Sequence, residues 1–307
     1  MKSQKILTGM LLALSALSLA ACSPASEAAP QGQGNNDGLC PAEGLSFGVE
    51  PYENPSKLEP AYRTLAEALS QKLNCPIEVQ IVEDYAAEVL AMRNGKLDLG
   101  QFGPMGYVFA DGKAGAEPLV SFGTADGELS TYTGGIWVPK DSSIRRVEDL
   151  RGKDLALGSV GSTSGDVLPR YALAKAGVAE NELNVNYAGG HPEALLALTN
   201  GTVDAAEINS QTLETATSEG NFTVEDYRQI WTSDPIPNDP ITVAPDMDPK
   251  LKDAISQALL NLEPETIQEV ANFLDVKPAG NLQKVTKETY APLFDLAKTM
   301  KLTEDDI

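Results

Sequence analysis

The spacing of apolar residues along the chain switches between two values, one typical of strands and one typical of helices. Apolar residues at alternate positions predict strands at 45–49 and 77–81. Between these strands the apolar residues recur every three or four positions, which predicts an amphipathic helix beginning near Asn54-Pro55. The residues that form this helix pattern are Leu58, Tyr62, Leu65, Leu69 and Leu73.

The alternation of strand and helix patterns continues along the rest of the chain. Further strands are predicted at 97–102, 119–122, 135–138, 154–158, 184–187, 203–208, 229–231 and 241–243. Further helices are predicted at 84–92, from 103 onward, after Ser164, at 192–199, after Asn209, and at 249–262, 264–274 and 288–300. This order predicts an α/β fold with mostly parallel sheets flanked by helices.

The strands and helices fall into two sets of about a hundred residues each, which predicts two lobes. We place one lobe at 40–132 plus 240–307 and the other at 133–239, with two strands crossing between them near 131–135 and 234–240. Ligands of open α/β sheets bind beyond the carboxyl ends of the strands. Residues at such positions are Glu50, Tyr52, Tyr85, Phe102, Ser162, Thr163, Ser164, His191, Asn209, Gln211 and Asp239.

The turn Gly161-Ser162-Thr163-Ser164-Gly165 follows a predicted strand and precedes a predicted helix. The first N–H groups of a helix lack partners within the helix, and the helix dipole favours negative charge there. Three hydroxyl groups add donors that carry no charge. The turn therefore indicates a site for a small oxyanion, with an ordinary helix cap as the alternative.

The first residues have the pattern of an export signal. Lys2 and Lys5 precede an apolar stretch at 6–20 that is too short to span a membrane comfortably. The stretch ends in Leu19-Ala20-Ala21-Cys22, which resembles a bacterial lipobox and predicts a lipoprotein signal peptide at 1–21 with lipidation of Cys22. A plain secretory signal is the alternative. Residues 22–39 are rich in small and polar residues and predict a flexible tether.

Two further cysteines, Cys40 and Cys75, each lie shortly before a predicted strand. In an exported chain an even pair predicts a disulfide. The chain has one His and no C-x-x-C pair, so no metal site is expected. No cofactor is expected either.

The formal net charge of −21 argues against nucleic acid as a partner. The same charge does not exclude an anionic ligand, because salt screens surface charge beyond about 8–10 Å. A buried site is governed by its own dipoles.

Several motifs occur together in a recognisable order. They are the lipobox, Gly48-Val49-Glu50-Pro51, Asp84-Tyr85-Ala86, Asp98-Leu99-Gly100-Gln101-Phe102-Gly103-Pro104, Ser162-Thr163-Ser164-Gly165, Ala188-Gly189-Gly190-His191, Val203-Asp204-Ala205-Ala206 and Ile236-Pro237-Asn238-Asp239-Pro240. In this the chain resembles the phosphonate, phosphite and phosphate-binding subunits of ABC importers. The resemblance implies a periplasmic binding protein of type II, whose two lobes close on a small phosphorus oxyanion about a hinge of two crossing strands. It implies a binding protein and not an enzyme.

The resemblance also implies a ligand set and partners. Members of this family bind the phosphoryl oxygens with the hydroxyl turn, two tyrosines and a histidine, and an Asp faces the ligand. The matching residues here are Ser162, Thr163, Ser164, Tyr85, Tyr132, His191 and Asp239. The implied partners are an ABC permease and the membrane, through the lipid anchor, and the protein is expected to be a monomer.

Each of these residues also has a structural interpretation. A lone His such as His191 is often structural, but its place at a predicted helix start favours a binding role. Tyr85 could belong to the core, and Asp239 could cap a turn. Tyr52, Phe102 and Tyr107 are predicted to pack without binding.

Gln211 and Asp239 bear on the identity of the ligand. Gln211 stands where family members that bind aminoalkyl phosphonates have a Glu, which favours a compact ligand such as phosphite, methylphosphonate or phosphate. A carboxylate at Asp239 can accept the O–H of a monoprotonated phosphorus oxyanion and reject sulfate-like anions.

Two other functions fit parts of the sequence. A sensor subunit for a membrane kinase would use the same site, and a hydrolase could be built from Ser164, His191 and Asp239. The hydrolase is weakened because Thr163, and not a Ser, stands at the centre of the Gly161–Gly165 turn. The zinc-hydrolase motif H-E-x-x-H and the nucleotide-binding motif G-x-x-x-x-G-K-[ST] are both absent from the sequence.

Overall fold

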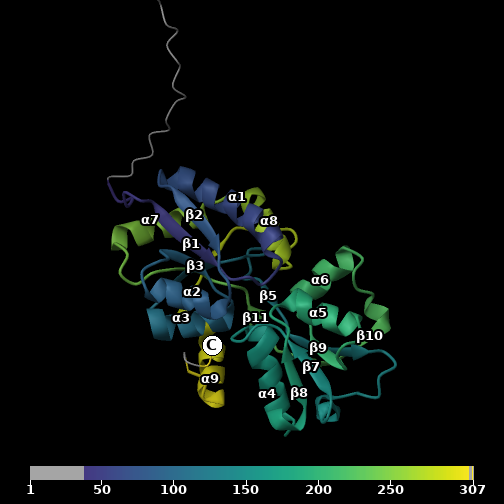
Figure 1. Ribbon diagram of the computed structural model, residues 1–307. Helices are drawn as coiled ribbons and strands as arrows, with labels where there is room; N and C mark the ends of the chain where they lie inside the picture. The colour runs from purple at the N-terminus through teal and green to yellow at the C-terminus, as the bar shows by residue number, and fades with distance from the viewer. Residues whose placement is uncertain (1–37, 304–305, 307) are drawn as a thin grey trace, which may run out of the picture. The chain divides into compact units, whose positions relative to one another are not determined.

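Two β-sheets and a short two-stranded ribbon organise the chain in the computed structural model (Figure 1). The structure describes residues 38–303 and 306, which all belong to one compact unit. The predicted signal peptide, the predicted lipidation site at Cys22 and residues 22–37 of the predicted tether lie outside the described residues.

The first sheet has six strands in the order β13-β4-β12-β3-β1-β2. Their bounds are β1 Leu45–Val49, β2 Ile77–Ile81, β3 Leu99–Gln101, β4 Glu117–Ser121, β12 Ile241–Val243 and β13 Gln283–Lys284. β1 pairs in parallel with β2 and β3, whereas β12 is antiparallel to β3 and β4, and β13 is antiparallel to β4.

The second sheet has five strands in the order β10-β6-β9-β7-β8. Their bounds are β6 Gly135–Pro139, β7 Asp154–Leu157, β8 Asn184–Tyr187, β9 Ala205–Glu207 and β10 Tyr227–Thr232. β7 is parallel to β8 and β9, and β6 is antiparallel to β9 and β10.

The prediction of mostly parallel sheets is therefore wrong, because both sheets are mixed. The strands β6 and β12 follow the passages of the chain between the sheets, and each enters its sheet in the direction opposite to its neighbours. Strand patterns show where strands occur but not the direction in which a strand enters, which is set by the path of the chain between the sheets.

The ribbon consists of β5 Thr131–Tyr132 and β11 Ile236–Pro237, which pair antiparallel with Ile236 opposite Tyr132. These strands lie where the sequence predicts that the chain crosses between the lobes. The two passages therefore run side by side.

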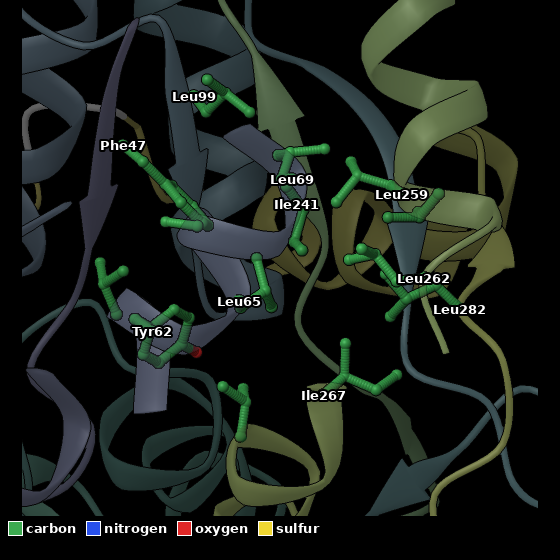
Figure 2. Close-up of a cluster of buried hydrophobic side chains, with 14 of the residues drawn as sticks. Phe47, Tyr62, Leu65, Leu69, Leu99, Ile241, Leu259, Leu262, Ile267 and Leu282 are labelled. Carbon is green, nitrogen blue, oxygen red and sulfur yellow. The ribbon is translucent and has the colours of Figure 1, made fainter. Parts of the chain in front are cut away.

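Helices cover both faces of the first sheet. α1 Pro55–Leu73, α7 Pro249–Leu260 and α8 Pro264–Phe273 contribute to one hydrophobic cluster, and Figure 2 shows its leucines converging with Phe47 of β1 and Ile241 of β12. The second cluster involves α2 Tyr85–Arg93, α3 Pro104–Ala114 and α9 Ala291–Met300. The C-terminal helices thus complete the first lobe.

The second sheet is buried on both faces in the same way. Leu155 and Leu157 of β7 pack in one cluster with Leu173 of α4 Leu168–Lys175, whereas Ala156 packs in another with Leu195 of α5 His191–Thr199. The alternation follows from the pleat, which points successive side chains to opposite faces. The remaining helix, α6 Ser210–Ser218, contributes Ala216 to the second of these clusters.

Several predicted elements end at other residues than expected. The predicted strand 203–208 is shorter, since β9 covers Ala205–Glu207. The predicted helix 288–300 divides into a 3₁₀ turn, Lys287–Tyr290, and α9. Pro292 lies in the first turn of α9, where its missing N–H costs no helical hydrogen bond.

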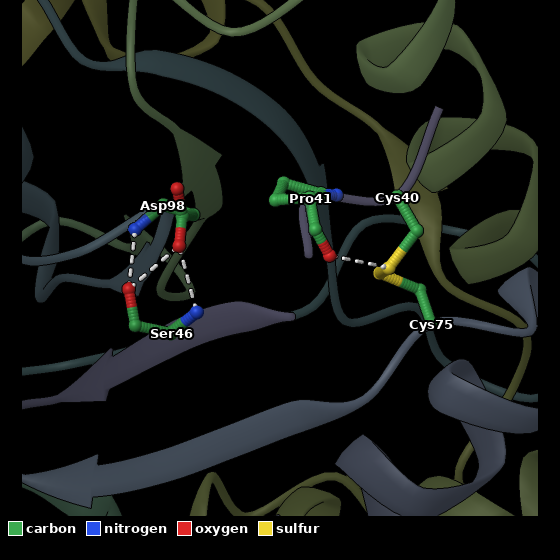
Figure 3. Close-up of a disulfide and its surroundings, with 5 residues drawn as sticks. All are labelled: Cys40, Pro41, Ser46, Cys75 and Asp98. Carbon is green, nitrogen blue, oxygen red and sulfur yellow. Dashed lines mark hydrogen bonds between the residues drawn. A yellow bond between two sulfur atoms is a disulfide. The ribbon is translucent and has the colours of Figure 1, made fainter. Parts of the chain in front are cut away.

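Cys40 and Cys75 form a disulfide in the structure, with their Cα atoms 5.5 Å apart (Figure 3). It joins the segment before β1 to the segment before β2. Beside it, Asp98 accepts hydrogen bonds of 2.7 Å from both the backbone N–H and the hydroxyl of Ser46 in β1. None of the helices described by the structure is both long and apolar enough to cross a membrane.

We expect replacement of both cysteines by Ala to lower the free energy of unfolding by about 3–4 kcal/mol. The reason is that the disulfide closes a loop with a sequence separation of 35 and so restricts the unfolded chain. Urea unfolding of the double variant and of Cys40→Ala alone should give equal losses, since either removes the bridge. A double variant as stable as the wild type would contradict this account.

Candidate functional site

The hydroxyl turn begins a helix at the carboxyl end of β7. Ser162 is the N-cap of the turn Thr163–Val167, and its Oγ accepts a hydrogen bond of 3.2 Å from the Gly165 N–H. Gly161 has φ +84°, a conformation that favours glycine, and so lets the chain bend into the turn. Ser162 therefore acts as a helix cap, while Thr163 and Ser164 lie in the first turn of the helix.

The turn forms one wall of a small cavity of about 10 Å³. The cavity is lined by Glu50, Tyr52, Tyr85, Gly103, Tyr132, Ser162, Thr163, His191, Asn209, Gln211 and Asp239. Seven of the eight predicted ligand-binding residues are in this set. Ser164 is buried next to it, and its Oγ accepts a hydrogen bond of 3.2 Å from the Asn209 side chain.

A direct hydrogen bond crosses between the elements of the two sheets at this cavity. The Met105 N–H, in the first turn of α3, donates to the Thr163 Oγ1 at 2.8 Å. Because the Thr163 hydroxyl accepts this bond, its own proton can be given to another acceptor. Burial raises the pKa of Tyr85 and of Tyr132 well above the ordinary value, so both keep their O–H donors.

His191 lies at the start of α5 and is held by two neighbours. Its Nδ1 is 2.6 Å from Glu207 Oε1, and its Nε2 is 3.3 Å from Ser162 Oγ. Burial lowers the pKa of His191, but the charge of Glu207 and its hydrogen bond outweigh burial, so the pKa is raised. Burial also raises the pKa of Glu207. The pair therefore keeps its shared proton to a higher pH than an isolated imidazole does.

This geometry corrects the triad considered for a hydrolase. The carboxylate bonded to His191 is Glu207 and not Asp239, and the hydroxyl beside its Nε2 is Ser162 and not Ser164. Glu207 stands on β9, the middle strand of the sheet, and its exposed fraction is 0%. The sequence could not pair it with His191, because the contact depends on the packing of α5 against β9.

Two carboxyl groups, Glu50 and Asp239, also line the cavity. Burial raises the pKa of Asp239 to about 7, and burial with the charges of Glu88 and Asp239 raises the pKa of Glu50 well above its ordinary value. Burial likewise raises the pKa of Glu88, which lies behind the cavity. Of the described residues that line the cavity, none is Lys or Arg. An anion here must be bound by neutral donors, by the His191–Glu207 pair and by its own protons.

The chain matches a family model described as the ABC transporter, phosphonate, periplasmic substrate-binding protein, over residues 47–290. The chain belongs to this family. Members of the family are solute-binding proteins of ABC importers, and the family places the folded part of the chain outside the cytoplasm.

Two curated relatives of this family are similar to the chain. The phosphonates-binding periplasmic protein of Escherichia coli strain K12 is 27% identical over 250 residues, covering 78% of this chain and 74% of that protein. The phosphate-import protein PhnD of Mycolicibacterium smegmatis is 30% identical over 206 residues, covering 63% of this chain and 64% of that protein. The match therefore spans less than two thirds of the length of the second relative.

A solved structure of the family has the same fold. PhnD1 from Prochlorococcus marinus, in complex with methylphosphonate, has a TM-score of 0.73 and 19% identity, covering 84% of this chain and 98% of that chain. The chain thus has the two-lobed fold of the type II periplasmic binding proteins.

Four residues that line the cavity are absent from the predicted ligand set. They are Glu50, Tyr52, Gly103 and Asn209. All four follow strands, a signal the sequence carries, but a strand end alone does not show which side chains turn inward. Among the described residues, no group of three or more His, Cys, Asp or Glu is placed to hold a metal ion.

We expect Asp239→Asn to flatten the pH dependence of the stability of the ligand-free protein. A carboxyl with a raised pKa keeps its proton in the folded state between pH 3.8 and about 7, while the unfolded chain has lost it. The stability that Asp239 contributes is therefore lost as pH rises through this window, by about 4 kcal/mol in total.

Urea unfolding in phosphate-free buffers at both ends of this window measures the effect. The matched control is Asp234→Asn, which removes an exposed carboxyl on the other side of β11 and should run parallel to the wild type. Parallel curves for Asp239→Asn and the wild type would refute the assignment.

Proposed function

We propose that this chain captures a small phosphorus oxyanion, namely phosphite, methylphosphonate or phosphate, and delivers it to an ABC permease. The observation that carries the proposal is the cavity itself, which is lined by hydroxyl, imidazole and amide groups without Lys or Arg. The names of the family and of its relatives support the same class of ligand.

The phosphoryl oxygens would face the hydroxyl turn. Thr163 can donate its hydroxyl proton to a ligand oxygen while it accepts from the Met105 N–H, which polarises the donated bond. The Tyr85 and Tyr132 hydroxyls lie beside Ser162 and Thr163, respectively, and can reach the same oxygens. Fixed dipoles of this kind stabilise an anion without a cation nearby.

Asp239 would recognise the protonation state of the ligand. It is 4% exposed, so its carboxylate needs a donor when it is charged. A monoprotonated phosphorus oxyanion supplies an O–H, whereas sulfate does not. The site therefore selects against sulfate.

The two lobes, at 40–132 plus 240–307 and at 133–239, would close about β5 and β11. Closure buries the ligand among donors from both lobes. A lipid on Cys22 would anchor the protein to the membrane, a tether at 22–39 would let it reach the permease, and the working form would be a monomer.

The contacts that link Ser162, His191 and Glu207 also raise the question of hydrolysis. We propose that the protein binds and does not hydrolyse, because Ser162 Oγ accepts the capping hydrogen bond from the Gly165 N–H, which makes this oxygen a weaker nucleophile. Incubation with chromogenic phosphoesters should release no product. Turnover that disappears in Ser162→Ala would overturn this part of the proposal.

We expect Thr163→Val to weaken the binding of phosphorus oxyanions by about 1–3 kcal/mol, because a buried ligand oxygen loses its donor and the Met105 N–H loses its acceptor. Calorimetry with phosphate, phosphite and methylphosphonate measures the loss.

The control for this variant is Thr242→Val. It removes a buried hydroxyl of the first sheet that donates to the Gly100 carbonyl away from the cavity, and it should lower stability without changing affinity. Unchanged affinity in Thr163→Val would contradict the assigned role of the turn.

A further inference from the structure

Glu50 is a cavity residue without an assigned role. It directly follows β1 and is 1% exposed. Its Oε1 accepts a hydrogen bond from the Gly103 N–H, at the start of α3. Its Oε2 is buried and has no hydrogen-bond partner among the described residues. A buried acceptor without a donor is costly, which points to a partner supplied by a ligand.

Two glycines at the start of α3 leave space for the Glu50 carboxyl group. A Cβ on Gly103 would lie 2.4 Å from Oε1, and a Cβ on Gly106 would lie 3.2 Å from Oε2. Any other residue at Gly103 would displace Glu50. The carboxyl is thus held in one place by two glycines and a backbone N–H, and not by chance packing.

Glu50 and Asp239 line the same cavity as the hydroxyl turn, so two carboxyl groups are present in it. The lining includes no aliphatic side chain that would favour a methyl group. The three anions of the proposed function differ in the donors they offer. In its singly charged form phosphate has two O–H groups, whereas phosphite and methylphosphonate have one each.

We propose that Glu50 is a second acceptor for ligand protons beside Asp239, and that the site therefore prefers dihydrogen phosphate to phosphite and methylphosphonate. This inference rests on the proposed function and specifies its ligand. One O–H of phosphate is donated to Asp239 and the other to Glu50 Oε2, while the two remaining oxygens accept from the hydroxyl turn. Phosphite and methylphosphonate leave one carboxyl without a donor.

Calorimetry of the wild-type protein against the three anions tests the ranking at a pH just above 7, where Asp239 can lose its own proton, with each affinity expressed per singly charged anion. We expect phosphate to bind about ten- to a hundredfold more tightly than the other two. If phosphite or methylphosphonate binds as tightly as phosphate, the inference is wrong and the proposed function stands. If none of the three anions binds, the proposed function itself fails.

Glu50→Gln tests the residue. The amide keeps an oxygen for the Gly103 N–H but replaces the unpartnered oxygen with a donor. We expect phosphate to lose about ten- to a hundredfold in affinity, while phosphite and methylphosphonate change by less than about threefold. Equal losses for all three anions, or no loss for any, would assign Glu50 a structural role only.

Glu88→Gln is the matched control, because Glu88 is equally buried and its charge acts on Glu50, but it does not line the cavity. It should keep the ranking of the wild type. If it removes the preference for phosphate as Glu50→Gln does, the ranking comes from the charge of the cluster and the contact assigned to Glu50 is wrong. The wild-type ranking remains a test even if a variant fails to fold.

Discussion

The hydrogen bond from the Met105 N–H to the Thr163 hydroxyl connects the start of α3, beside the first sheet, with the turn that follows β7 in the second. It uses an N–H that has no partner within its own helix. It also leaves the Thr163 proton to be donated to a third group. In the proposed function, a ligand oxygen that accepted this proton would be linked to both lobes through one hydroxyl, so ligand binding and lobe closure would stabilise each other.

The same region explains how an acidic chain can hold an anion. Helix starts surround the cavity, with Gly103 before α3, Ser162 at the hydroxyl turn, His191 at α5 and Asn209 before α6. Each directs N–H groups that lack a partner within their own helix, and the positive end of a dipole, toward the carboxyl ends of the strands. These contributions act within a few ångströms and are buried, so the net charge of −21 on the whole chain does not cancel them.

The buried carboxyl groups need hydrogen-bond donors, whereas the helix starts provide them. Glu50, Glu88 and Asp239 all have raised pKa values because burial penalises their charged forms. They cost the ligand-free protein stability as pH rises, and they limit the ligands that fit to those that bring protons. In the proposed function, the donors would favour any small oxyanion, and the carboxyl groups would restrict the choice among them.

The sequence by itself determined the α/β class, the two passages between lobes and most of the cavity. These features follow from local signals. The spacing of apolar residues, the turn residues and the helix starts each depend on residues that are close together in the sequence. The hydroxyl turn could be recognised because all its donors lie within a few residues. The order of the motifs indicated the family. The family in turn implied the expected roles of Tyr85, Tyr132 and Asp239.

Only the tertiary structure decided strand direction, the partner of His191 and the place of Glu50. β12 reaches the first sheet after a long excursion of the chain, so its antiparallel pairing with β3 depends on the path between the sheets. Glu207 meets His191 because α5, which begins at His191, packs against β9. Glu50 faces the cavity because Gly103 and Gly106, more than fifty residues later in the chain, leave room for its carboxyl group.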